Sequence, residues 1–345
     1  MDERCQCGAF RTRSGSGPGT KRLALWLALA GAFCPAGCGS RRQVRIAVIP
    51  QTEGTMIWEA AHVGAEIGAD HTGAFIYWNA PTREDDVEAQ IALVERVVDD
   101  DYQGLVLAPD QALALISPVR RALAHGIPTV IIGSPLPIPA GGNLSYILND
   151  DQEGGRLAAK RVGALLGGHG TVAILGIDPD VTGTTIRARA FEQYLVENYS
   201  GIRIADRRMG SYNVPHEQQV AEDVLRAHPD LDAIVALMSP SVDGTLSALG
   251  TTPAKRDIKV IGFDMAGLPS FVRNPHLDCV ILEDTRTMGQ RAIEWIQARR
   301  LGQPAPSVVS LDPKLVTKEN VNSEEVRAMV VQDWTLGHRR WSTSQ

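Results

Sequence analysis

Carboxylates, an arginine, small hydroxyls and a tryptophan follow short apolar segments along the chain. Such side chains donate and accept hydrogen bonds for a ligand rich in hydroxyl groups, and a tryptophan can cover the apolar face of a ring. We expect this set to line a ligand-binding site. In chain order its members are Thr55, Trp58, Ser134, Asp150, Arg187, Ser239, Asp264 and Glu283.

Motifs for catalysis or phosphate binding do not occur in this sequence. It contains no G-x-x-x-x-G-K-[ST], G-x-S-x-G or H-E-x-x-H, and none of its eight His pairs at metal-ligand spacing. The glycine-rich stretch 167–170 follows a predicted helix, which is the wrong order for a phosphate-binding loop. A hydrolase using Asp264 or Glu283 would need a paired nucleophile and base, and none is visible. We therefore expect no enzyme, no catalytic residue, no metal and no cofactor.

Apolar runs and helical periodicity alternate along the chain. The apolar runs predict strands at 44–49, 74–78, 104–108, 127–132, 146–148, 171–175, 202–209, 233–237, 258–262 and 279–282. The periodic segments predict helices at 58–69, 85–98, 118–125, 154–166, 184–199, 216–227, 242–249 and 288–300. This alternation predicts an α/β fold with parallel sheets and right-handed crossovers.

About ten strands exceed one comfortable open sheet, so two lobes are expected. The best hinge candidates are 148–151 and 283–285. In open α/β sheets, ligands bind beyond the carboxyl ends of the strands, where the candidate residues fall. The predicted architecture is therefore two doubly wound parallel-sheet lobes, joined by a multi-strand hinge, with a ligand cleft between them.

The first residues have the layout of a secretory signal. Charges ending at Lys21-Arg22 precede an apolar stretch, 23–33, which is too short to span a bilayer. Ala36-Gly37-Cys38 resembles the lipobox of a bacterial lipoprotein, although Pro35 replaces the usual aliphatic residue. We expect a signal peptide over 1–37 and lipidation of Cys38; the alternative is a plain signal peptide cleaved nearby.

Composition narrows the classes of partner. The 345 residues are 44% hydrophobic and 21% charged, with a net charge of -6 and no long basic run. A nucleic-acid partner is therefore not expected, because phosphate binding needs clustered Lys and Arg.

Removal of the signal would leave Cys279 as the one cysteine besides Cys38, so no disulfide is expected. Residues 332–345 read as a polar tail.

Several fragments in order resemble one protein family. They are Asp150 with Gly154-Gly155, Arg187-Ala188-Arg189-Ala190-Phe191, Val260-Ile261-Gly262-Phe263-Asp264, Glu283 with 285–289, and 315–321. The chain resembles type I periplasmic binding proteins of the ribose and galactose kind, which are solute receptors of ABC importers. The resemblance covers nearly all of residues 44–330.

The resemblance implies lobes of 44–148 plus 285–314 and of 149–284 plus 315–331, after a tether at 38–43. It implies a periplasmic monomer, attached to the membrane only by its lipid, that closes on a sugar or polyol and delivers it to an ABC transporter permease. An alternative is a sugar-sensing receptor that hands its closed form to a chemoreceptor or sensor kinase. A transcription factor of the lactose-repressor kind would need an N-terminal helix-turn-helix, which residues 1–40 do not supply.

Departures from the family pattern indicate a ligand other than ribose. Ser134 follows Gly133 where pentose receptors often have Asp-Arg, Met238-Ser239 replaces Asn-Asp, and Glu283 replaces a neutral Gln.

Purely structural roles also stay open for most of the candidate site residues. These are a core position for Trp58, a backbone-bonding hinge role for Asp150, a solvent-exposed charge for Arg187, helix capping for Ser239 and Ser241, capping of the next turn for Asp264, and a hinge ion pair for Glu283.

Overall fold

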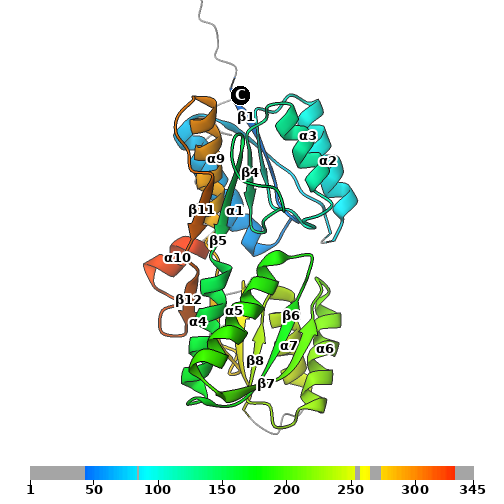
Figure 1. The fold of residues 1–345 in the computed structure, drawn as a ribbon, viewed down its shortest axis with the longest axis vertical. Coiled ribbons are helices and arrows are strands. Elements are labelled where there is room, and N and C mark those ends of the chain that lie inside the picture. Colours follow the sequence, from blue (N-terminus) through cyan, green and yellow to red (C-terminus); the bar gives the residue numbers. More distant parts are fainter. Residues whose placement is uncertain (1–42, 84, 253–256, 265–272, 331–345) are drawn as a thin grey trace, which may run out of the picture. The chain divides into compact units, whose positions relative to one another are not determined.

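Two six-stranded sheets organise the part of the chain that the computed structural model describes, residues 43–83, 85–252, 257–264 and 273–330 (Figure 1). These residues belong to one compact unit, Gln43–Gln345. The predicted signal peptide (1–37), Cys38 and the polar tail (332–345) lie outside the described residues, as does nearly all of the tether.

The first sheet is parallel throughout, in the order β11-β5-β4-β3-β1-β2. Its strands are β1 (Arg45–Ile49), β2 (Phe75–Trp78), β3 (Gly104–Leu107), β4 (Thr129–Ile132), β5 (Leu144–Asn149) and β11 (Val308–Leu311). Separate apolar cores cover its two faces, which explains the nearly continuous apolar runs of the central strands. The helices are α1 (Met56–Thr72) and α9 (Thr285–Arg300) on one face, and α2 (Val87–Asp99) and α3 (Ile116–Ala124) on the other.

The second sheet has the order β12-β10-β9-β8-β6-β7, and its pairs are parallel except for the antiparallel pair of β10 and β12. Its strands are β6 (His169–Ile177), β7 (Gly201–Met209), β8 (Ala233–Ala236), β9 (Lys259–Phe263), β10 (Leu277–Leu282) and β12 (Lys314–Thr317). Its helices are α4 (Asp151–Leu165) and α5 (Thr182–Asn198) on one face, and α6 (Val214–Ala227), α7 (Ser239–Thr251) and α10 (Glu324–Val330) on the other.

The predicted fold class, two parallel α/β lobes, is confirmed. Most helices begin two or three residues before the predicted position; α4 starts at Asp151 where the apolar pattern begins at Gly154. The pattern detects the first core-facing residue, whereas a helix starts at its polar cap. Strands β11 and β12 and helix α10 were not predicted, because four-residue strands and a two-turn helix are too short for their periodicity to be recognised.

Within the described residues the chain passes between the two sheets after β5, after β10 and after β11. The first two crossings are the predicted hinge segments, 148–151 and 283–285, and the third was not predicted. The crossing segments are hydrogen-bonded to one another: Asp150 N donates to Leu311 O at 2.8 Å, and Asp284 N donates to Asn149 Oδ1 at 3.4 Å. The lobe boundaries given above stay a prediction.

Helices α1 and α9 pack with their backbones in close approach on the first sheet. A Cβ atom on Gly64 of α1 would overlap the carbonyl oxygen of Arg286, and one on Gly289 of α9 would overlap that of Ala61. Glycine at these two positions is what allows the contact. The packing places the start of α1, with Trp58, next to the start of α9, where Thr285 Oγ1 donates to Ile57 O at 2.8 Å.

Candidate functional site

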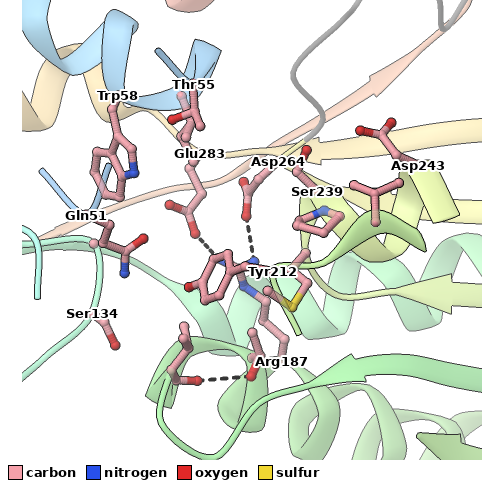
Figure 2. A pocket seen from close by; sticks show the side chains of 18 of the residues that line it. Gln51, Thr55, Trp58, Ser134, Arg187, Tyr212, Ser239, Asp243, Asp264 and Glu283 are labelled. Atoms are coloured by element: carbon pink, nitrogen blue, oxygen red, sulfur yellow. Dashed lines mark hydrogen bonds and ion pairs between the residues drawn. The ribbon is translucent and has the colours of Figure 1, made fainter. Parts of the chain in front are cut away.

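Loops at the carboxyl ends of strands from both sheets border one pocket of about 320 Å³. This is near the lower end of the range of about 300–1,000 Å³ that is typical of small-molecule sites. Its position agrees with the general rule for open α/β sheets. Seven of the eight predicted residues line it: Thr55, Trp58, Ser134, Arg187, Ser239, Asp264 and Glu283 (Figure 2).

Arg187 of α5 is the centre of the charged part of this pocket. Its side chain is buried; Nε donates to Asp151 Oδ1 at 2.7 Å, and Nη1 donates to Asp264 Oδ2 at 2.6 Å and to Leu237 O at 2.9 Å. Nη2 is ion-paired with Glu283. Figure 2 shows Asp264 and Glu283 both directed to the guanidinium. A guanidinium has five N–H donors, so these contacts leave one for a ligand.

One cation shared among three carboxylates explains the acid–base balance of the cluster. Burial acts to lower the pKa of Arg187, but the charges of Asp264 and Asp151 outweigh it and raise that pKa above its ordinary value. Burial raises the pKa of Asp264 by more than its bond to Arg187 lowers it. The Arg187 charge is divided among several partners, so it does not compensate fully for the burial of Asp264.

The backbone of Asp264 adopts a conformation that few residue types accept. It follows β9 with φ at 53°, in the left-handed region that Asp tolerates better than most non-glycine residues. Its N–H donates to Ile281 O at 3.1 Å, which ties it to β10. The capping alternative for Asp264 concerns residues 265–272, which lie outside the described part of the chain.

Asp150 is the predicted site residue that does not line the pocket. Its carboxylate accepts a hydrogen bond from Glu153 N at 2.8 Å and caps α4, which matches the backbone-bonding alternative. Asp284 caps α9 in the same way, accepting from Thr287 N at 2.9 Å. The adjacent Asp151 points instead to Arg187.

Trp58 belongs both to the apolar core and to the pocket wall. It is 5% exposed, packs in the core shared by α1 and α9, and lines the pocket. Gly133, which follows β4, has φ at 73°, and a Cβ on it would lie 3.0 Å from Trp58 Cη2. The glycine therefore lets the backbone turn closely against the indole and brings Ser134 into the pocket.

Three buried polar atoms on the pocket wall have no hydrogen-bond partner among the described residues. They are Thr55 Oγ1, Ser134 Oγ and Asp264 Oδ1. Burying a polar atom without a partner costs free energy, and native structures contain few such atoms. The convergence of these three atoms on one pocket, from loops of both sheets, is the arrangement expected where a ligand supplies the missing hydrogen bonds.

The capping alternative for the two serines does not describe the start of α7. Met238 is the N-cap, and no side chain makes the cap hydrogen bond there. Ser239 is the first residue of the helix and lines the pocket. Ser241 Oγ donates to the carboxylate of Glu217, behind the pocket wall.

Sequence reasoning missed two polar residues that line the pocket, Tyr212 and Asp243. Tyr212 lies three residues beyond β7, so the rule applied to the other strand ends would have found it. Asp243 lies four residues after Ser239 and shares its helix face. The remaining lining residues are Gln51, Gly54, Ile57, Gly133, Val181, Gly183, Thr184, Val214, Met238 and Pro240.

Three further features of the described residues bear on metal binding, membrane insertion and nucleophilic reactivity. No group of three or more His, Cys, Asp and Glu side chains among them is placed to hold a metal ion. No helix among them combines the length and apolarity needed to cross a bilayer. Cys279 is a buried free thiol in β10 whose pKa is raised by burial, which makes it a poor nucleophile.

Comparison with protein families shows a match over most of these elements. Residues 46–268 match the sequence model of the periplasmic binding protein domain. The D-apiose import binding protein of Paraburkholderia graminis is 24% identical over 254 residues, which cover 71% of this chain and 79% of that protein. The ribose import binding protein of Bacillus subtilis is 23% identical over 287 residues, which cover 83% of this chain and 91% of that protein.

Solved structures share the fold. An ABC transporter solute binding protein of Agrobacterium vitis, bound with α-D-tagatopyranose, superposes with a TM-score of 0.77 at 22% identity, covering 84% of this chain and 99% of that one. A periplasmic solute binding protein of Actinobacillus succinogenes with bound D-allose gives a TM-score of 0.74 at 25% identity, covering 80% and 98%.

Proposed function

Because the chain belongs to the periplasmic binding protein family, we propose that it is an extracytoplasmic sugar-binding receptor. In this proposal it captures a sugar or polyol by hinge closure and delivers it to the permease of an ABC transporter. Its relatives include import binding proteins named for D-apiose and ribose and a D-allose-binding periplasmic protein. The chain acts as a binding protein and not as an enzyme.

The observation that carries this proposal is the set of unpartnered atoms in the pocket. Thr55 Oγ1 and Ser134 Oγ follow strands of the first sheet, and Asp264 Oδ1 follows β9 of the second. Hydroxyl groups of one small ligand would satisfy atoms from both sheets at once. A ligand held in this way favours the form in which both sheets contact it, so binding shifts the hinge equilibrium toward closure.

The proposal is tested by thermal-shift screening of the purified protein against pentoses, hexoses and polyols. A ligand should raise the melting temperature in a concentration-dependent manner, because it binds the folded state and not the unfolded one. Calorimetry on each compound that gives a shift should then show one site per chain. If no member of the panel shifts the melting temperature or releases heat, the proposed function is wrong.

Replacing Trp58 with leucine should weaken binding of the identified sugar at least tenfold, as measured by calorimetry. The indole lines the pocket, and an aromatic ring over a sugar contributes packing that an aliphatic side chain does not reproduce. Trp78→Leu is the matched control. Trp78 is stacked on His62, with ring centroids 4.1 Å apart, and does not line this pocket. Equal loss in both variants, or none in Trp58→Leu, would contradict a contact between Trp58 and the ligand.

We further propose that the lobes comprise 44–148 plus 285–314 and 149–284 plus 315–331. The division of β1–β5 and β11 from β6–β10 and β12 between the sheets supports these boundaries. The hinge then consists of the three crossings, which are hydrogen-bonded to one another through Asp150, Leu311, Asn149 and Asp284.

The same proposal places the protein in the periplasm as a lipoprotein attached through Cys38. Its support is the sequence Ala36-Gly37-Cys38 after the apolar stretch 23–33. A Cys38→Ala variant should then leave the membrane fraction and appear in the soluble periplasmic fraction, because the lipid is its attachment. Immunoblotting of fractions, with Cys279→Ala as the control variant, measures this. A Cys38→Ala protein that sediments with membranes as before would show that the anchor is elsewhere.

A further inference from the structure

The charged side chains that line the pocket have a negative balance. Among the described lining residues, Arg187 is the one cation, and Asp243, Asp264 and Glu283 are carboxylates. Asp151, which pairs with Arg187 from outside the lining, adds a fourth carboxylate. The pocket and its border thus hold four carboxylates and one guanidinium, so this part of the pocket lacks positive charge.

The single positive charge of Arg187 does not neutralise all the carboxylates that line the pocket. Its N–H groups are engaged by Asp151, Leu237, Asp264 and Glu283, yet Asp264 Oδ1 is buried with no partner among the described residues. Asp243 has no ion pair in the described part of the chain, and burial raises its pKa. Removing a carboxylate from water without a partner costs far more than removing a neutral group.

We propose, building on the proposed function, that the ligand is a monosaccharide or polyol that carries a protonated amine, with its ammonium group bound by Asp264, Glu283 and Asp243. An ammonium has three donors and no acceptor, which complements carboxylate oxygens. Its charge offsets the excess that Arg187 leaves. Trp58 and Tyr212 line the same pocket, and aromatic rings attract cations through their faces.

The same charge balance discriminates against acidic sugars. A sugar acid or sugar phosphate would place a negative group among carboxylates that are already short of cations, and like charges brought together at a binding site lower the affinity by about a hundredfold or more. The remaining N–H of Arg187 is a single donor beside three competing acceptors, so it cannot serve as an anion site. The acidic lining therefore acts as a determinant of specificity.

Calorimetry on the intact mature protein with matched pairs tests the proposal. The pairs are D-glucosamine with D-glucose, D-galactosamine with D-galactose, and N-methyl-D-glucamine with D-glucitol, at a near-neutral pH that keeps the amines largely protonated and does not add to the protonation of the pocket carboxylates. The amine should bind at least tenfold more tightly than its hydroxyl counterpart in each pair that binds. Glu283→Gln should reduce this preference at least tenfold, whereas Glu192→Gln should leave it unchanged, since Glu192 pairs with the exposed Arg207 outside the pocket.

The outcomes separate this inference from the function on which it rests. If the hydroxyl member binds as tightly as the amine, or more tightly, the inference is overturned while sugar capture stands. If no compound of either kind binds, the proposed function itself is overturned. Should Glu283→Gln fail to fold, Asp243→Asn takes its place and should show the same loss of preference. An amine preference that neither variant changes would refute the role of these carboxylates.

Discussion

An Arg187→Ala variant is expected to lose about 3–5 kcal/mol of unfolding free energy and to bind its ligand more than tenfold less tightly. The substitution leaves Asp151, Asp264 and Glu283 buried without their shared cation, and unpaired buried charges destabilise proteins by about this amount. Binding falls because the pocket carboxylates lose the group that positions them. Urea unfolding without ligand and calorimetry with ligand measure the two effects.

The control for this experiment is Arg207→Ala. Arg207 also pairs with a carboxylate, Glu192, at 2.6 Å, but its side chain is 49% exposed, so the loss should be within about 1 kcal/mol. Adding Glu283→Gln to Arg187→Ala should recover part of the lost stability, because it removes one of the uncompensated charges. A loss in Arg187→Ala no greater than that in Arg207→Ala would show that the cluster does not depend on its cation.

Gly64→Ala should destabilise the protein by about 3 kcal/mol, the upper end of what overpacking costs. The new methyl group would overlap the carbonyl oxygen of Arg286, a backbone atom that cannot rotate away, so α1 and α9 must separate. The same separation moves Trp58 at the start of α1 and should weaken ligand binding. Thermal and urea unfolding of the variant measure the loss of stability.

Gly250→Ala is the matched control for Gly64→Ala, and we expect it to raise the stability of the protein instead of lowering it. Gly250 lies in α7, and a Cβ placed on it meets no atom within 4 Å. Alanine there should therefore stabilise the protein by about 0.5–1 kcal/mol, because it reduces the freedom of the unfolded chain. Equal effects of the two substitutions would mean that the α1–α9 contact is looser than described.

The fold class was accessible from the sequence because its determinants are local. Apolar runs and helical periodicity depend on neighbouring residues, and their alternation leaves few alternatives to a parallel α/β arrangement. The strand-end rule then selected most of the pocket, since Trp58, Arg187, Asp264 and Glu283 lie on the segments that follow β1, β6, β9 and β10. Residues placed by this rule need no knowledge of distant contacts.

The pairing of charges was decided by the tertiary structure. Successive residues at the start of a helix point about 100° apart, so Asp150 caps α4 while Asp151 reaches Arg187, and the sequence cannot say which neighbour does which. Likewise, β11 and β12 form because they add to the edges of existing sheets, and four residues have no such preference alone. The sequence by itself determined which kinds of side chain reach the pocket. Packing of α4 and α5 on the second sheet determined that one arginine is shared by three carboxylates, because its partners lie between 36 and 96 residues from it along the chain.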